Sequence, residues 1–317
     1  MPKISVIIPV YNRQDIVAHT VQSVLNQTDR DLEVLVVDDG STDDTRAVIQ
    51  NLADSRVNYF YKANDGPASA RNFGLSKARG EYIAFLDSDD LWPENYLEVM
   101  LANLVNCPGF GAAYTPITVF YPDGRSVDSY KKPEGKSGSL SLDLFKHSFI
   151  WIFAAVFCRS VWNDFYFDEQ LKKTCEDSDV ILRLSMQTRF LFVPQVKALH
   201  RISNDSISSL TGTDCMRLLV LERFYFQLGG DKIVPARTAR RRLSHTTRKI
   251  AEFSSKKGSK MAALKLYGHA VRYWPYDARL YWGLLKTWFL NAAKDPEPNW
   301  VMPRPLGDPW HKQIHLA

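Results

Sequence analysis

The sequence of 317 residues predicts an α/β protein, with a doubly wound, mostly parallel sheet flanked by helices and a C-terminal helical extension. Three observations predict this class. Short apolar runs alternate with amphipathic stretches of about 10 to 13 residues through the first hundred residues, and crossovers of that length join parallel strands. Each apolar run ends at polar or acidic residues. Beyond Gly212, apolar residues recur only at helical spacing.

Four apolar runs predict the buried parallel strands, at residues 4–10, 32–37, 57–61 and 82–86. Amphipathic helices are predicted between them, at residues 15–26, 41–53 and 68–78. Ser41 followed by Asp44 resembles a capping box at the start of the second helix. Pro67 suits the first position of the third helix, and Gly80 is expected to close it.

The middle of the chain gives weaker signals. A helix is predicted to run to Val105, and strands at 112–121 and 125–130 flank a Pro-Asp-Gly turn, a hairpin expected to add antiparallel strands to the sheet. Residues 128–141, with three Lys, two Gly and a Pro, are predicted to form a mobile loop that acts as a lid. An acidic cluster precedes a helix through Arg183, and a short strand follows at 190–193.

The C-terminal third predicts four helices, at residues 216–227, 234–253, 260–274 and 278–293, and then an irregular tail over 296–317. The expected boundaries are a sheet domain over 1–211, divided into halves at 1–106 and 107–211, and a helical extension over 212–295.

Composition indicates a cytoplasmic protein. The four cysteines form no Cys-x-x-Cys pair, so neither a zinc site nor a disulfide framework is expected. No signal peptide is recognised, and the longest apolar run, 149–158, is half of the ~20 residues that a spanning helix needs. The net charge is only +5, but residues 237–260 carry nine Lys or Arg against the single acid Glu252. This basic stretch favours an anionic surface as a partner, and no nucleic acid is expected.

Polar side chains follow three of the predicted parallel strands. Tyr11 follows the first strand, Asp39 the second, and the cluster Asp87-Ser88-Asp89-Asp90 the fourth. Because the carboxyl ends of parallel strands meet at one edge of a sheet, these residues are expected to converge. Carboxylates at such an edge suit a ribose or a hard cation.

Five motifs together resemble glycosyltransferase family two. They are, in order, Val-Ile-Ile-Pro-Val-Tyr-Asn, Val-Val-Asp-Asp-Gly-Ser-Thr-Asp, Ala-Arg-Asn-x-Gly, Phe-Leu-Asp-Ser-Asp-Asp and Glu-Asp-x-Asp-x-x-x-Arg. The match covers residues 3–210. The resemblance implies a GT-A fold, a nucleotide-diphospho-sugar donor and inversion at the anomeric carbon, with a glycan or a lipid-linked saccharide as acceptor.

The resemblance also implies which residues hold the donor. Pro9 and Tyr11 would form a wall against the base, and Asp39 would accept a hydrogen bond from the base imide N–H. A carboxylate cannot donate, so this contact indicates uracil or thymine, and hence a UDP- or dTDP-sugar. For the rest of the donor, the resemblance implies Arg71 at the nucleotide and Asp87 at the ribose, with Ser88 as a further residue that binds the nucleotide-sugar.

A divalent cation and a general base complete the implied site. Asp89, with Asp90 ligating or just behind it, would hold Mg²⁺ or Mn²⁺ against the diphosphate. Asp177 is our choice for the base that deprotonates the acceptor hydroxyl, with Glu176 and Asp179 as competitors.

In one position the chain departs from the family pattern. Ser203 stands where many members carry a His that completes the metal shell, so either His200 supplies this ligand after a local shift or the site does without it.

Several alternatives stay open. A sugar-nucleotide nucleotidyltransferase would share the α/β plan, but residues 10–14 are not the Gly-rich phosphate loop it needs. A non-catalytic glycan-binding scaffold is the other reading. The aromatic and basic residues of the C-terminal helices have two possible roles. Either they lie in a membrane interface, which makes the protein peripheral at the inner face of the membrane, or the aromatic residues pack on the sheet domain while the Lys and Arg residues face solvent.

Overall fold

The computed structural model describes residues 2–121, 124–128, 135–171, 174–202 and 213–289. The chain divides into two compact units. Residues 1–140 and 149–209 form the first, which we call the sheet unit, and residues 141–148 and 210–317 form the second, which we call the helical unit. The short helix α5 (Ser141–Lys146) therefore belongs with helices that lie far from it in the sequence.

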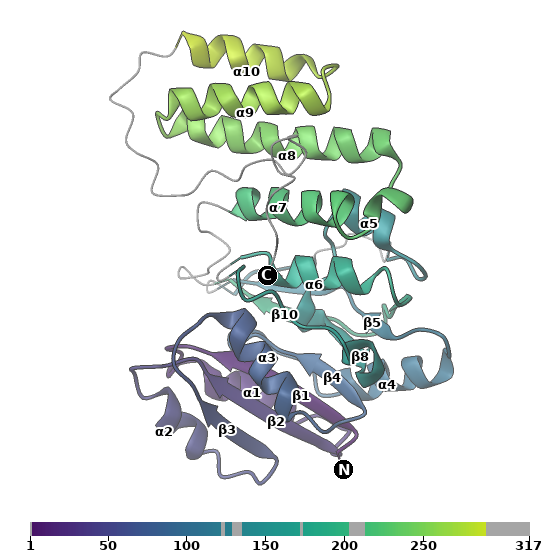
Figure 1. Ribbon diagram of the computed structural model, residues 1–317. Helices are drawn as coiled ribbons and strands as arrows, with labels where there is room; N and C mark the ends of the chain where they lie inside the picture. Colours follow the sequence, from purple (N-terminus) through teal and green to yellow (C-terminus); the bar gives the residue numbers. More distant parts are fainter. Residues whose placement is uncertain (1, 122–123, 129–134, 172–173, 203–212, 290–317) are drawn as a thin grey trace. The chain divides into compact units, whose positions relative to one another are not determined.

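The strands of the sheet unit are β1 (Ile4–Val10), β2 (Leu32–Asp38), β3 (Val57–Tyr61), β4 (Tyr82–Phe85), β5 (Ala112–Tyr114), β6 (Ile117–Phe120), β7 (Ser126–Asp128), β8 (Ala155–Cys158), β9 (Phe190–Phe192) and β10 (Ala198–Arg201). Seven of them form one sheet in the order β3-β2-β1-β4-β8-β5-β9. Only β8 runs antiparallel to its neighbours, β4 and β5. The predicted doubly wound, mostly parallel sheet is confirmed (Figure 1).

The helices of the sheet unit are α1 (Val17–Leu25), α2 (Thr45–Gln50), α3 (Pro67–Lys77), α4 (Tyr96–Asn106) and α6 (Glu176–Leu184), with 3-10 turns at Ile152–Ala154 and Arg159–Trp162. Each of the first three follows a parallel strand, as the sequence pattern predicts: α1 and α2 lead to the adjacent strand, whereas α3 leads back across the sheet to β4, which pairs with β1.

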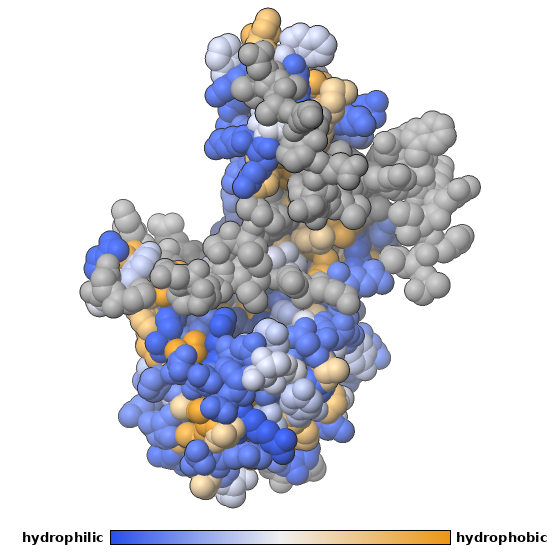
Figure 2. All heavy atoms as spheres, turned by 90° about the vertical axis from the view of Figure 1, so that its left-hand side faces the viewer, coloured by the Kyte–Doolittle hydropathy of each residue, from blue (hydrophilic) through white to orange (hydrophobic). Residues whose placement is uncertain are grey.

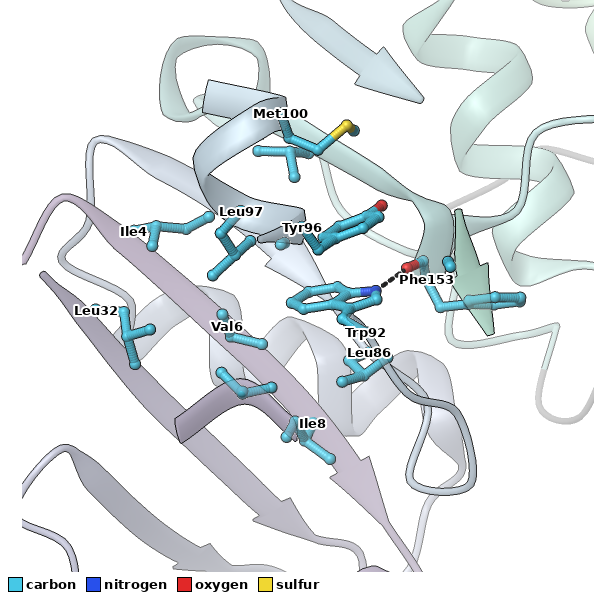
Figure 3. Packing of buried hydrophobic residues seen from close by; sticks show 14 of the residues in the cluster. Ile4, Val6, Ile8, Leu32, Leu86, Trp92, Tyr96, Leu97, Met100 and Phe153 are labelled. Carbon is cyan, nitrogen blue, oxygen red and sulfur yellow. Dashed lines mark hydrogen bonds between the residues drawn. The ribbon is translucent and has the colours of Figure 1, made fainter. Parts of the chain in front are cut away.

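The central strands are buried on both faces, which explains their mostly apolar sequence, and the buried polar pair within them is joined by a hydrogen bond of 2.7 Å from the Ser5 hydroxyl to Glu33. Every residue of β1 and β2 is buried. On one side of these strands, Trp92 stacks on Tyr96 with ring centroids 4.7 Å apart and donates its indole N–H to the Phe153 carbonyl at 2.8 Å (Figure 3). The cluster around them fixes the segment that follows β4.

Strand register brings the polar exits together. Val10 of β1 pairs with Asp38 of β2, and Ile7 of β1 pairs with Phe85 of β4. Tyr11, Asp39 and the segment after Phe85 therefore leave the sheet at the same edge, which confirms the predicted convergence of these three exits.

The predicted hairpin forms, but not in the main sheet. β6 pairs with β7 antiparallel and with β10 parallel, giving a separate three-stranded sheet. The chain leaves the main sheet after Tyr114, and Pro116, which has no N–H to donate, begins the connection to β6. The prediction of one continuous strand over 112–121 was wrong for this reason.

Two local predictions were also wrong. The N-cap of α2 is Asp44, which makes no side-chain cap bond, and the Ser41 hydroxyl instead accepts from the Asn12 N–H at 2.9 Å. Gly80 does not cap α3, which ends at Lys77 and has Ala78, in extended backbone, as its C-cap. A Cβ on Gly80 would lie 2.5 Å from the Ser5 nitrogen, so glycine is needed for close approach to β1.

The helical unit contains α5, α7 (Thr213–Phe226), α8 (Ala236–Lys256), α9 (Lys260–Tyr273) and α10 (Ala278–Trp288), with a 3-10 turn at Gly230–Lys232. α8 and α9 pack closely, and the Ser244 hydroxyl of α8 donates to the Ala270 carbonyl of α9 at 2.8 Å. α10 packs on them through Thr287 and Gly283. No helix in the described ranges is both long and apolar enough to span a membrane.

Several predictions fall on residues outside the described ranges. These are residues 129–134 of the loop expected at 128–141, the Ser203 position, the end of the helix expected at 278–293, and the tail over 296–317.

Candidate functional site

The acidic turn after β4 is held by its own backbone and by α1. The Asp90 N–H donates to the Asp87 carbonyl at 3.0 Å, and the Thr20 hydroxyl of α1 donates to the carbonyls of Ser88 and Asp90 at 2.9 and 3.0 Å. Leu91 then forms an antiparallel bridge with Leu199, which joins this turn to β10. The three carboxylates are thereby fixed at different depths.

Asp90 is the deepest of them and is fully buried. Its Oδ1 accepts from the Arg201 N–H at 3.0 Å and lies 2.9 Å from the His200 Nδ1. Its Oδ2 has no hydrogen-bond partner among the described residues. Burial raises the pKa of the Asp90 carboxyl far above its usual range, and the contact with His200 opposes this rise. Asp90 is therefore placed to hold His200.

His200 packs against two aromatic rings, those of Trp151 and Phe153, whose centroids are 5.6 and 5.4 Å from its own and 5.9 Å from each other. Burial lowers the pKa of His200, but the hydrogen bond and negative charge of Asp90 outweigh burial, so the net pKa is raised. Because Asp90 takes Nδ1, Nε2 is the ring nitrogen left for another partner.

Asp89 and Asp87 are half-buried at the same edge. Burial, and then the charge of Asp87, raise the pKa of Asp89, while the charges of Arg13 and His200 act in the opposite direction. Arg13 was not predicted as a site residue, although it follows Tyr11 closely in the first exit loop. No group of three or more His, Cys, Asp or Glu side chains among the described residues is close enough to hold a metal ion by itself.

Arg71 links the two acidic clusters. Its buried guanidinium donates to Asp87 Oδ1 at 2.7 Å and to Glu176 Oε1 at 2.8 Å, and it lies over the Phe167 ring at 5.4 Å. Burial disfavours the charge, but the two carboxylates outweigh it and raise the pKa of Arg71. Glu176 is 105 residues from Arg71 in the sequence, so this ion pair ties α6 to the edge of the parallel sheet.

Asp177 follows Glu176 in the first turn of α6. The helix is preceded by Cys175 in the left-handed region, at φ 70°, a conformation that costs a non-glycine residue energy and often marks a functional turn. Asp177 is half-buried, and its Oδ1 accepts from the Ser178 N–H at 2.7 Å. Burial, and then the charge of Glu176, raise the pKa of Asp177 to about 6. Its competitor Asp179 is buried and paired with Arg183 at 2.7 Å.

Asp39 lies at the end of β2 and is nearly buried. Its carboxylate accepts from the Lys62 ammonium at 2.6 Å and from the N–H groups of Asp65 and Gly66, at 3.1 and 2.7 Å. Asp38 points elsewhere and accepts from the Tyr59 hydroxyl at 2.6 Å. Lys62 was not predicted as a site residue, and its signal was its place directly after β3 at the same sheet edge.

Pro9 and Tyr11 flank the end of β1. Pro9 is buried within the strand, opposite Val37 of β2, whereas Tyr11 is half-exposed. Asn12 adopts a left-handed φ of 50°, and its side-chain oxygen accepts from the Thr42 N–H at 2.8 Å. This bond holds the exit loop of β1 against the exit loop of β2.

A sequence profile described as "Glycosyl transferase family 2" matches residues 5–165, half of the chain. The chain belongs to glycosyltransferase family 2. The matched range contains β1 to β4 and the acidic turn, and so most of the site described above.

Two curated relatives and one solved structure agree with this assignment. The transferase is 34% identical over 217 residues to the chondroitin synthase of Pasteurella multocida, an alignment that covers 66% of this chain and 22% of that protein. It is 48% identical over 94 residues to the GalNAc(5)-diNAcBac-PP-undecaprenol beta-1,3-glucosyltransferase of Campylobacter jejuni, covering 28% and 30%.

The crystal structure of S. aureus TarS 1-349 in complex with UDP-GlcNAc superposes with a TM-score of 0.63 at 20% identity, covering 88% of this chain and 82% of that chain. This likeness confirms the fold. The transferase spans only 17% to 30% of the length of the first curated relatives that it matches.

The structure of the transferase brings most of the predicted residues together. Arg71 joins Asp87 to Glu176, and strand register gathers Tyr11, Asp39 and the acidic turn. Two predicted residues take positions that the motifs did not indicate. Arg71 is buried between two carboxylates, and Asp90 is buried against His200.

Proposed function

We propose that this glycosyltransferase moves a sugar from a UDP- or dTDP-sugar to a hydroxyl group of a glycan or lipid-linked saccharide, with inversion at the anomeric carbon. The observation that carries the proposal is the Arg71 bridge. It places a half-buried carboxylate with a raised pKa, Asp177, next to the acidic edge at which nucleotides bind in sheets of this kind.

The base of the donor would be recognised by Asp39 and Lys62. Uracil and thymine present one N–H donor between two carbonyl acceptors. A carboxylate offers about four acceptor positions. Three protein donors already bind the Asp39 carboxylate, and its remaining position can accept the imide N–H. The Lys62 ammonium, 2.6 Å from that carboxylate, would donate to an adjacent carbonyl. Binding of UDP-GlcNAc by TarS, which shares this fold, supports a uridine nucleotide.

The residues around Asp89 fit a divalent cation. The charge of Asp87 raises the pKa of the neighbouring Asp89 carboxyl, and Asp90 keeps a buried oxygen with no hydrogen-bond partner among the described residues. Asp89 and the Nε2 of His200, with the donor's phosphates, would hold Mg²⁺ or Mn²⁺, and Asp90 would orient His200. When bound, the cation would supply positive charge at the leaving diphosphate.

Asp177 would act as the general base. At pH 7 a carboxyl with a pKa of about 6 is mostly ionised yet more basic than an ordinary aspartate. It would take the proton of the acceptor hydroxyl as the new bond from oxygen to C1 forms and the bond from C1 to the diphosphate oxygen breaks. Arg71 would fix the neighbouring Glu176 and keep its charge paired.

The acceptor class is proposed from the relatives. One is named as acting on an undecaprenol-linked saccharide, and another as a chondroitin synthase. We propose a cytoplasmic enzyme that reaches lipid-linked or polymeric glycans at an anionic membrane surface, using its basic helical unit.

Two measurements test the proposal. A panel of UDP-, dTDP- and GDP-sugars, with and without Mn²⁺, should give a metal-dependent rise in melting temperature with uridine or thymidine nucleotides only. Asp177→Asn should remove transfer while the UDP affinity changes by less than about threefold. Appreciable turnover by Asp177→Asn would refute its role as the base. Nucleotide binding with no transfer by the unmodified chain would favour a scaffold.

A nucleotidyltransferase would instead release pyrophosphate from a nucleoside triphosphate and a sugar phosphate, and a pyrophosphate assay distinguishes it.

A further inference from the structure

The outward face of α10 carries aromatic side chains where a helix of a soluble unit usually carries polar ones. Leu280 and Thr287 are buried on the inner face, and the Thr287 hydroxyl lies 3.1 Å from the Ser255 hydroxyl of α8. The side chains on the outer face are Tyr281, Trp282, Leu285, Trp288 and Phe289, which are 49%, 68%, 50%, 65% and 76% exposed. We call these five residues the aromatic face.

The aromatic face is large for a surface without a partner. Its exposed fractions are equivalent to about three whole side chains, on the order of 600 Å² if each contributes about 200 Å². The largest apolar patch on an ordinary monomer is about 300 to 600 Å² and is often functional. None of these five side chains is buried against the other described helices of the same unit.

Cations flank the aromatic face. The Lys260 ammonium lies 5.7 Å from the centre of the Trp288 ring, and Lys286 and Arg279 are exposed on α10 itself. Residues 210–289 contain sixteen Lys or Arg against five Asp or Glu, although the whole chain is only +5. Figure 2 shows hydrophobic and hydrophilic residues interspersed over the described side of the helical unit that faces the viewer.

We propose that the aromatic face of α10 docks on an anionic lipid surface. Trp, Tyr, Phe and Leu on one helix face, with Lys and Arg beside them, are the composition of helices that lie in the membrane interface. Two copies of this unit meeting through the same face would bring like charges together, which disfavours self-association. The inference extends the proposed membrane association and does not depend on the transfer reaction.

Flotation of the full-length chain with vesicles tests the inference. The chain should float with vesicles of phosphatidylcholine and phosphatidylglycerol in a 7:3 ratio at about 0.05 M salt, and much less with phosphatidylcholine alone or at about 0.5 M salt, where screening shortens the range of the charges. The triple variant Trp282→Ser, Trp288→Ser, Phe289→Ser should bind at least tenfold more weakly. Tyr166→Ser, which removes a similarly exposed aromatic ring from the sheet unit, should bind as the unmodified chain does.

The charged flank has its own variant. Lys260→Glu with Lys286→Glu should weaken binding to the anionic vesicles and leave the weaker binding to phosphatidylcholine unchanged. Circular dichroism shows whether each variant keeps its helices. If the triple variant loses them, the single variant Trp282→Ser, at the most exposed tryptophan of α10, replaces it in the flotation assay.

The inference is overturned if the full-length chain fails to float with anionic vesicles at low salt. Sedimentation at the same salt would then report whether a second copy covers the face, as a doubled mass. The inference is also overturned if the triple variant floats with the anionic vesicles as well as Tyr166→Ser does. Transfer activity is assayed separately on a soluble acceptor, so a failure of membrane docking is distinguishable from a failure of the proposed reaction.

Discussion

Replacing Arg71 is the most informative perturbation of the site. Arg71→Met has a similar length and leaves Asp87 and Glu176 without their shared cation. Each lost charge-assisted hydrogen bond is worth about 1.5 to 3 kcal/mol. Because Glu176 is nearly buried, removing its partner leaves a charge in the interior, and breaking such a buried pair costs about 3 to 5 kcal/mol. We expect a loss in this range for the free energy of unfolding of the sheet unit.

Urea unfolding followed by circular dichroism measures this loss. For a unit of this size, about 3 to 5 kcal/mol corresponds to a fall in Tm of roughly 6 to 20 °C. The control is Lys197→Met, which breaks the ion pair with Asp128 on the surface of the same unit, where both side chains are more than two-fifths exposed. This control should cost less than about 1 kcal/mol.

The same variant also changes the titration of the base. The positive charge of Arg71 lowers the pKa of Asp177, so its removal should raise that pKa, and the acid limb of the kcat/KM profile should move to higher pH. A loss of stability equal to that of Lys197→Met, together with an unshifted pH profile, would refute the reading of Arg71 as the link between the two acidic clusters.

Three further results are expected. In the unmodified enzyme, kcat should fall as the pH drops through about 6, because the base form of Asp177 is lost when it binds a proton, and a pH profile with no inflection between 5 and 7 would contradict this. Lys62→Met should weaken UDP binding about tenfold, as measured by calorimetry. Lys77→Met, on the last turn of α3, should leave UDP binding unchanged, because of these two lysines only Lys62 contacts Asp39. Gly80→Ala should destabilise the sheet unit by about 2 kcal/mol or more, because the added Cβ would press on the backbone of β1. The control Gly268→Ala, with open space around it in α9, should stabilise the helical unit by about 0.5 to 1 kcal/mol. Equal effects of the two substitutions on denaturant unfolding would contradict this account of Gly80.

The predicted elements that agree with the structure share one property, a strong local pattern. The residues of β1 and β2 are mostly apolar because both faces of the sheet are covered, and α1 shows clear helical spacing. The failures occur where the local pattern allows two outcomes. Tyr114 and Ile117 belong to one predicted strand, yet they pair in different sheets.

The site shows the same division. The motifs named Asp39, Arg71, the acidic turn and the Glu176-Asp177 pair from residue type and order. Nothing local in the sequence states that Lys62 pairs with Asp39, since 23 residues separate them. Likewise the sequence cannot show that Asp90 points inward to His200, which is 110 residues away.

By itself, then, the sequence determined the class of the fold, the family, and most of the residues at the sheet edge, because each follows from local periodicity or from motifs read along the chain. The tertiary structure decided the partner of each of those residues. It buried Arg71 between two carboxylates, turned Asp90 toward His200, and left the outer face of α10 exposed. Burial and ion pairing arise between segments far apart in the sequence, so they are set by how the chain packs and not by any one stretch of it.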